Sequence, residues 1–345
     1  MALQIGIVGL ATRFWPVALP QNLSALPNAR LRAIATVGAA DAEIQATAGI
    51  SKQQYAERFH AKVYDGIEEM IDAERLDTVV VCSRHSQHAD HVERAAAKKV
   101  RICICKSMAT SLRDADRIVA AGKKHGVPIA VGPGGRFEPQ HLVAREIIES
   151  GRIGRPISLR IAHSHGTIDA FPPGDWYRLE SEGGPELSLG WYVMDVLRAL
   201  LPRRVTRVFA EYHNFTSPGS PFMDEGKVIL RYEDDTMASC DMYFSNRFAF
   251  PTWELEVIGT KGAVRTHSGA PDDGVPRGLL WTADGMQKLD VPDGSFWPAD
   301  TAAWVNAFDR GEPPPIDAEE GRIITQISLA CWESAKKKRP VDVKG

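Results

Sequence analysis

Residues 101–109 read Arg-Ile-Cys-Ile-Cys-Lys-Ser-Met-Ala, an apolar run that ends at a single lysine, Lys106. Such a run is typical of a strand that is buried on both faces of a parallel sheet, and residues 112–125 then show helical spacing. Ligands bind beyond the carboxyl ends of strands in open α/β sheets. Lys106 is therefore our first candidate for chemistry, against the alternative of a solvated loop lysine.

The residues around this stretch alternate between short apolar runs and segments of helical spacing. The runs lie at 4–10, 31–37, 61–64, 78–82, 101–105 and 128–131, and the helical segments at 41–48, 52–59, 66–73, 87–98 and 112–125. Strands separated by helices of this length predict βαβ units in a doubly wound parallel sheet, a Rossmann-type domain. We place its first helix late, near Pro20, because a proline inside a helix costs about 3 kcal/mol.

The pattern changes after the turn-forming residues Gly132 to Gly135, where we place a boundary between domains 1–133 and 134–345. A helical segment, 139–150, leads to runs of alternating hydrophobicity at 157–165, 205–215, 227–232, 237–244, 253–259 and 263–267. Short turns between such runs predict antiparallel pairing. The fold class is therefore α/β, with a C-terminal α+β domain built on a large, mostly antiparallel open sheet.

Composition argues against several classes of protein. A net charge of −3 over 345 residues gives no basic surface for nucleic acid or anionic lipid. No run approaches the roughly 18 apolar residues of a membrane helix, and no basic leader precedes the first apolar run, so we expect a cytoplasmic protein. The five cysteines, at 82, 103, 105, 240 and 331, lack paired spacing and are expected to be reduced structural thiols.

The segment after the first apolar run is a degenerate dinucleotide-binding loop. It reads Gly9-Leu-Ala-Thr-Arg-Phe14, where G-x-G-x-x-G would let the backbone approach a pyrophosphate. Phe14 is expected to crowd the packing of helix on strand. The second run ends at Thr36 instead of the acid that holds ribose hydroxyls, which favours NADP over NAD, with Arg13 or Arg32 as phosphate partners. The alternative is that the site no longer holds a dinucleotide.

Several motifs, taken in order, resemble those of the Gfo/Idh/MocA oxidoreductases, the family of glucose-fructose oxidoreductase and inositol dehydrogenase. Ser83 and His88 match its Ser/Thr-Pro-x-x-x-His segment, and Cys105-Lys106-Ser107 keeps only the lysine of Glu-Lys-Pro. Loss of that proline removes the usual reason for a cis peptide after the lysine. The family's Asp-x-Gly-x-His is here Ser188-Leu-Gly-Trp-Tyr192. Further likeness lies at Gly132, 136–137, 149–154, 175–178, 183–184 and 258–262.

The resemblance implies oxidation of a carbinol with hydride passed to a nicotinamide, and a sheet face that pairs with another subunit. We therefore predict an NAD(P)-dependent dehydrogenase or reductase that acts on a sugar, cyclitol or related hydroxy compound, as a homodimer or homotetramer. The cofactor is NADP or NAD. The predicted cofactor-binding residues are Gly9, Ala11, Thr12, Arg13, Phe14, Thr36, Ser83, Arg84, His88 and Lys106.

A helix over 185–201 carries Ser188, Tyr192 and Asp195 at helical spacing, so they share a face that would form a cleft wall. We predict Tyr192 as the acid/base, Lys106 as its electrostatic partner and substrate-oxygen anchor, and Asp195 as the orienting group. The alternatives are a cleft-lining ring for Tyr192 and a capping or surface role for Asp195. The predicted substrate-binding residues are Lys106, Arg136, Trp176, Arg178, Ser188, Tyr192 and His165.

Two other hypotheses concern metals and loss of activity. On a helix, His85 and His91 would point roughly 120° apart, so the histidines at 85, 88 and 91 cannot converge on one ion and no metal site is expected. The altered nucleotide loop suggests a competing class, a non-catalytic or regulatory ligand-binding protein on a decayed dehydrogenase scaffold. A redox-neutral enzyme with a retained cofactor is a variant of the enzyme hypothesis.

Overall fold

In the computed structural model the chain forms two compact units, residues 1–133 with 297–325, and residues 134–296 with 326–345. The structure describes residues 2–10, 12–166, 171, 174–216, 223–246, 248, 250–269 and 274–344. The division into domains 1–133 and 134–345 stays a prediction, and the compact units differ from it in the place of residues 297–325. No helix among the described residues is long and apolar enough to cross a membrane.

The first unit is built on a six-stranded parallel sheet, as predicted. Its strands are β1 Leu3–Val8, β2 Ala29–Ala35, β3 Lys62–Tyr64, β4 Thr78–Val81, β5 Arg101–Cys105 and β6 Ile129–Gly132. They lie in the order β3-β2-β1-β4-β5-β6, and every pair of neighbours is parallel. The order reverses at β1, which is the switch point where open α/β sheets bind ligands.

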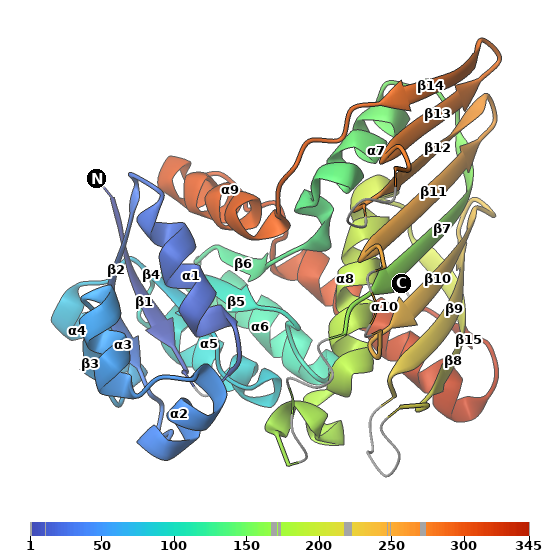
Figure 1. Ribbon diagram of the computed structural model, residues 1–345. Helices are drawn as coiled ribbons and strands as arrows, with labels where there is room; N and C mark the ends of the chain where they lie inside the picture. The colour runs from blue at the N-terminus through green and yellow to red at the C-terminus, as the bar shows by residue number, and fades with distance from the viewer. Residues whose placement is uncertain are drawn as a thin grey trace. The chain divides into compact units, whose positions relative to one another are not determined.

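Helices cover both faces of this sheet (Figure 1). They are α1 Trp15–Ser24, α2 Asp41–Ala48, α3 Lys52–Phe59, α4 Ile67–Glu74, α5 His88–Ala97, α6 Leu112–His125 and α9 Phe296–Arg310, with the 3-10 turn η1 His85–Gln87 before α5. The bounds of α2, α3 and α6 are those that the sequence predicts. Ser51 caps α3 through the amide of Gln54, and Ser111 caps α6 in the same way through Asp114.

Helix α1 begins at Trp15, earlier than the predicted start near Pro20, and Pro20 lies inside it. Proline lacks the N–H that would bond to the carbonyl four residues earlier, which is that of Pro16. The hydroxyl of Tyr55, a fully buried side chain of α3, donates to this carbonyl at 2.5 Å. A side chain from a neighbouring helix therefore replaces the missing backbone hydrogen bond, which explains why the spacing of prolines misplaced the helix.

Residues 297–325 complete the first unit. Trp304 and Phe308 of α9 belong to the same buried hydrophobic core as strands β1 and β2. The residues before the last helix add to the edge of β6, where the N–H of Val131 donates to the carbonyl of Ile316 at 2.9 Å. The sheet is thereby extended by a segment that is distant in sequence.

The second unit is built on a nine-stranded, mostly antiparallel sheet, as predicted. Its strands are β7 Pro156–Ser164, β8 Val205–His213, β9 Glu225–Tyr232, β10 Met237–Tyr243, β11 Trp253–Gly259, β12 Gly262–His267, β13 Gly278–Thr282, β14 Gly285–Leu289 and β15 Val341–Asp342. They lie in the order β14-β13-β12-β11-β7-β10-β9-β8-β15, and β7 with β10 is a parallel pair. The sequence pattern missed β13, β14 and β15.

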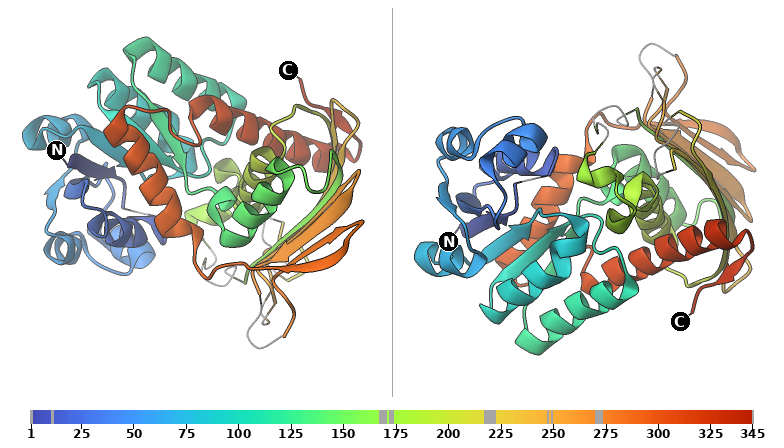
Figure 2. Two further views of the ribbon diagram at one scale, coloured as in Figure 1. Left: turned by 90° about the horizontal axis from the view of Figure 1, so that it is seen from above. Right: turned by 90° about the horizontal axis from the view of Figure 1, so that it is seen from below.

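Helices lie on one face of this sheet, and in the described part of the chain no helix covers the other face (Figure 2). The helices are α7 Pro139–Glu149, α8 Gly184–Leu200 and the second half of α10 Ala318–Lys337, with 3-10 turns η2 Gly135–Phe137, η4 Trp176–Arg178 and η5 Glu180–Glu182. Helix α8 contacts β7 and β10, and α7 contacts β12. Buried and exposed side chains alternate along the strands accordingly, as in β9 and β10.

Candidate functional site

Three strand ends of the first unit lie side by side. Strands β1, β4 and β5 end in register, so Gly9, Ser83 and Lys106 follow neighbouring strands. Gly9 has a φ of 91°, and a Cβ atom built on it would lie 2.7 Å from the Cα of Ser83. Only glycine fits between these two segments, so the backbone can approach a pyrophosphate here. The residues present therefore fit a dinucleotide although the later loop glycines are replaced.

The rest of the loop is anchored to the sheet. The Thr12 hydroxyl donates to the Cys82 carbonyl at 2.8 Å, which ties the loop to the end of β4. Phe14 precedes α1 and is 47% exposed, so the expectation that it crowds the helix against the sheet is wrong. Arg13 donates to a carbonyl near the end of α2 at 3.5 Å. Ala11 lies outside the described residues.

A cavity of about 220 Å³ lies at the ends of β1, β2 and β4. It is lined by Gly9, Thr36, Val37, Gly38, Ala39, Glu43, Ser83, Arg84 and Gln87. The Thr36 hydroxyl donates to Oδ1 of Asp65 at 3.0 Å, and Arg84 forms an ion pair with Glu43 at 2.5 Å. The sequence analysis missed both acids. One signal was available, because Asp65 directly follows the short apolar run at 61–64.

His88 is fully buried and connects the segments that follow strands β4 and β5. Its ring nitrogens lie 3.0 Å from the carbonyl of Ser83 and 3.1 Å from that of Met108. Burial lowers the pKa of His88, and the facing carbonyls oppose this shift. His91 lies 2.8 Å from the Ser83 hydroxyl, and burial lowers its pKa to about 4. Within the residues that the structure describes, no three His, Cys, Asp or Glu side chains are arranged to hold a metal ion.

Lys106 is 7% exposed at the end of β5. Its N–H donates to the Gly132 carbonyl at 2.7 Å, and its ammonium lies 6.0 Å from the centre of the Trp15 ring. Burial lowers the pKa of Lys106 to about 7, and the neighbouring Cys105 opposes this shift. A lysine that changes charge near neutral pH is suited to proton transfer. The peptide bond between Lys106 and Ser107 is cis, although the proline that would explain it is absent.

Helix α8 carries Ser188, Tyr192 and Asp195 in the second unit. All three are buried, and their place in a cleft wall stays a prediction. Tyr192 is 7% exposed and makes edge contacts with the rings of His163 and Phe296, each at 5.6 Å between centroids. These contacts fix the plane of the phenol ring.

Asp195 and Arg136 form a buried ion pair. Oδ1 of Asp195 accepts from Nε of Arg136 at 2.6 Å, and Oδ2 accepts from the Arg136 backbone N–H at 2.9 Å. The two side chains are 0% and 11% exposed. A pair taken out of water is tolerated only when its geometry is good, as it is here. The structure thus brings two predicted site residues together, and Asp195 holds Arg136 and the turn η2 in place.

Sequence reasoning missed a cluster around Trp253 of β11. The pairing of β7 with β11 places Trp253 opposite His163, and the rings stack at 3.7 Å between centroids with 4° between their planes. His141 meets the indole edge-on at 4.8 Å. Burial raises the pKa of Glu138 to about 7, although hydrogen bonds with Trp253 and Gln140 oppose the rise. The second unit therefore contains an ionisable group near neutral pH that no local pattern indicated.

The remaining predicted substrate-binding residues lie in turns and at a strand end of the second unit. Trp176 is 7% exposed in η4. Arg178 donates from Nε to the carbonyl of Phe171. The His165 ring lies 4.8 Å from that of Phe244. These contacts do not test the binding of a substrate, so the three roles stay predictions.

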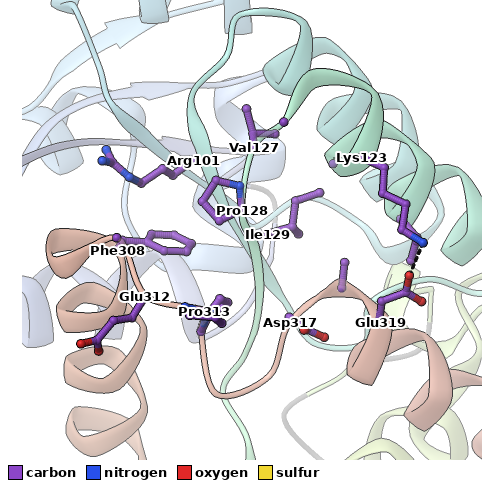
Figure 3. Close-up of a pocket in the computed structure, with 16 residues that line it drawn as sticks. Arg101, Lys123, Val127, Pro128, Ile129, Phe308, Glu312, Pro313, Asp317 and Glu319 are labelled. Carbon is purple, nitrogen blue, oxygen red and sulfur yellow. Dashed lines mark ion pairs between the residues drawn. The ribbon is translucent and has the colours of Figure 1, made fainter.

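A second, larger pocket of the first unit lies at the opposite edge of the sheet. It has a volume of about 630 Å³, and its lining includes Arg101 and Pro128, at the starts of β5 and β6, and Phe308. Figure 3 shows these side chains around the opening, with Lys123 paired to Glu319 on its far side. Ligands of open α/β sheets bind at the other edge, and none of the predicted site residues lines this pocket.

Comparison with family descriptions gives two matches. Residues 3–133 match an oxidoreductase family with an NAD-binding Rossmann fold, and residues 141–265 match a GFO/IDH/MocA C-terminal domain. Together these matches cover more than half of the chain.

Individual relatives are more distant. A myo-inositol 2-dehydrogenase from Thermotoga maritima is 26% identical over 81% of this chain and 84% of its own length. A D-apiose dehydrogenase from Paraburkholderia graminis is 29% identical over 82% and 77%. The structure of an oxidoreductase from Agrobacterium radiobacter in complex with NAD+, L-tartaric acid and magnesium superimposes with a TM-score of 0.83 over 99% of both chains, at 20% identity. At that identity the likeness concerns the fold.

Proposed function

The chain belongs to the Gfo/Idh/MocA family of oxidoreductases, and we propose that it oxidises a carbinol, or reduces the corresponding carbonyl, of a sugar, cyclitol or related hydroxy compound. The observation that carries the proposal is Lys106, a lysine at a strand end whose pKa burial lowers to about 7. The names of the inositol and apiose dehydrogenases support the substrate class.

The nucleotide would be held by residues at the ends of β1, β2 and β4, namely Gly9, Thr12, Thr36, Ser83 and Arg84. A bound nicotinamide supplies the hydride acceptor when the carbinol is oxidised. The chain's own residues handle the proton and the oxygen: the Tyr192 hydroxyl exchanges the proton, and Lys106 binds the oxygen and favours its anionic form. The ring of His88 bonds to the carbonyl of Ser83 after β4 and to that of Met108 after β5, which supports the position of Lys106 between them.

Arg136 is proposed as a donor to substrate hydroxyls, and Asp195 as the residue that positions it. Asp195 accepts from both the side-chain Nε and the backbone N–H of Arg136, which supports this division of roles. A guanidinium held at Nε keeps its remaining N–H groups in a fixed plane, which suits recognition of a polyhydroxylated ligand.

The proposal includes a homo-oligomer formed through the outer face of the nine-stranded sheet. Strand register places Met237, Ile258, Trp281 and Met286 in one row across that face, and all four are exposed. An exposed apolar row of this kind is typical of an interface. Light scattering should give a multimer for the wild type and a smaller mass for Ile258→Glu; a wild-type monomer would contradict this part.

The enzyme proposal is tested by two measurements on the purified protein. NADH and NADPH are titrated by fluorescence, and a panel of cyclitols, aldoses and polyols is then screened with oxidised nucleotide for growth of nicotinamide absorbance. We expect nucleotide binding and turnover of at least one compound. Tight binding without net turnover would point to a redox-neutral reaction, and binding of neither nucleotide would remove the enzyme proposal.

A further inference from the structure

We infer that the nucleotide site selects NAD over NADP, and that Asp65 and Glu43 set this preference in place of the missing acid at the end of β2. The inference rests on the proposed function, because it concerns the nucleotide of that reaction. Thr36 considered alone favours NADP, since a hydroxyl tolerates the 2′-phosphate of NADP better than the usual carboxylate at this position would. The residues around Thr36 favour NAD instead.

The register of β2 and β3 brings Asp65 to Thr36. Ala35 pairs with Tyr64, so Thr36 and Asp65 are the next residues in line after the two strands end. The Thr36 N–H donates to the Tyr64 carbonyl at 2.9 Å, and the Val37 N–H donates to the Asp65 carbonyl at 3.1 Å. The acid that is absent from one strand end is therefore supplied by the adjacent one.

The hydrogen bonds of Thr36 decide what it can offer a ligand. A threonine hydroxyl has one hydrogen and two lone pairs. Here the hydrogen is directed to Oδ1 of Asp65 at 3.0 Å, with the Tyr64 carbonyl more distant at 3.4 Å. The oxygen can therefore accept a hydrogen bond from a ribose hydroxyl but cannot donate one to a phosphate oxygen. The backbone N–H groups of Thr36 and Val37 are also engaged, which removes two further donors.

Charge in the cavity wall acts in the same direction. Glu43 and Arg84 both line the cavity, and their ion pair largely cancels the charge of Arg84, which is the only cation among the described residues that line it. A 2′-phosphate carries about −1.5 to −2 charge at neutral pH and would meet the carboxylates of Glu43 and Asp65. Asp65 is exposed, so solvent screens its repulsion of a 2′-phosphate. We therefore expect Glu43 to contribute more to this repulsion than Asp65 does.

The test measures the ratio of the NADPH and NADH dissociation constants by fluorescence titration of the full chain. The variants are Glu43→Gln, Asp65→Ala and Asp65→Asn, with Glu57→Gln, an exposed acid outside the cavity, as the charge-matched control. Thermal unfolding shows that each variant is folded. Asn keeps an oxygen that accepts from Thr36, whereas Ala frees the hydroxyl to donate to a phosphate.

We expect the wild type to bind NADH at least about tenfold more tightly than NADPH, and Glu43→Gln to narrow the ratio by about three- to tenfold. Asp65→Ala should narrow it more than Asp65→Asn does, and Glu57→Gln should leave it unchanged. A wild-type preference for NADPH, or equal effects of all four variants, would overturn the inference while leaving the enzyme proposal intact. Binding of neither nucleotide would overturn both.

Discussion

Lys106 in the first unit and Glu138 in the second are ionisable groups that burial brings to neutral pH from opposite directions. Burial lowers the pKa of Lys106 to about 7 and raises the pKa of Glu138 to about 7. Each is least costly to the fold in its neutral form, which Lys106 reaches above pH 7 and Glu138 below it. The lysine lies at a strand end, where chemistry is expected, whereas the glutamate lies beside a packed aromatic cluster. Burial alone therefore does not identify a catalytic group; its place in the fold does.

The largest effect expected is on turnover. Lys106→Met should lower kcat/KM by about a thousandfold or more, because an electrostatic partner of the reacting oxygen is lost. Fluorescence titration should show that NADH still binds. Lys98→Met, on the same unit but paired with Asp72 at the surface, is the control and should keep wild-type kinetics. Normal turnover in Lys106→Met would show that Lys106, like Glu138, is a buried ionisable group without a catalytic role.

Asp195 is a third buried ionisable group, and it differs from Lys106 and Glu138 because its counter-ion, Arg136, is buried with it. Asp195→Ala removes the buried carboxylate that accepts from the Arg136 guanidinium and should destabilise the second unit by about 3–5 kcal/mol. Hydrogen exchange of the α8 amides measures this local loss. Glu333→Ala breaks an exposed pair with Lys337 on α10 and should leave exchange unchanged. Equal protection in both variants would show that the buried pair contributes nothing.

The pH dependence of stability should reveal Lys106 directly. Between pH 7 and its ordinary pKa of 10.5 the unfolded chain binds this proton more than the folded chain does, so the stability of the wild type rises with pH in that window. Lys106→Met should be more stable than the wild type below pH 7, with a gain that disappears as the pH approaches 10.5. Urea unfolding across this range provides the measurement, and a gain that grows with pH would contradict the assignment.

The pH dependence of stability that Glu138 causes should be opposite in sign to that of Lys106 and smaller. Its folded pKa lies above the ordinary 4.5, so its contribution to stability is complete below pH 4.5 and is lost as the pH rises through 7. Glu138→Gln should gain about 1–2 kcal/mol at pH 8, discounted because part of the carboxyl reaches solvent, and little at pH 5. A loss of stability at pH 8 instead would mean that the hydrogen bonds with Trp253 and Gln140, and not burial, dominate.

Much of the first unit could be predicted, because local sequence patterns mark its strands and helices. Apolar runs separated by helical segments specify a parallel sheet, and parallel strands place their carboxyl ends at one edge, which is how Gly9, Ser83 and Lys106 were found together. The exceptions are contacts between segments distant in sequence. The support that Tyr55 gives to the Pro16 carbonyl leaves no local signature. The only local sign of Asp65 is its place directly after the run at 61–64, which does not show that it pairs with Thr36.

The second unit was harder to predict in detail. Strands with alternating burial, such as β9, were recognised, whereas β14 has four exposed residues in five and therefore no alternation. The dipeptide Asp284-Gly285, which is typical of hairpins, was the available signal for β13 and β14, which a turn at 283–284 connects. The spacing of Ser188, Tyr192 and Asp195 predicted the right helix, but it did not show how deeply the three side chains would be buried. The periodicity of a helix shows which side chains share one of its faces. It does not show what that face packs against, which for α8 includes strands β7 and β10 of the sheet.

The alternation of the chain between its two units has a consequence for biosynthesis. Strands β1 to β6 emerge from the ribosome first, but their core includes Trp304 and Phe308, and the edge of β6 is completed by Ile316. All of residues 134–296 must be translated in between, which takes roughly 10 to 30 s at typical rates. During this delay the nascent sheet exposes an apolar surface and an open edge, so the first unit is completed only when nearly the whole chain has been made, and chaperones have that interval in which to bind it.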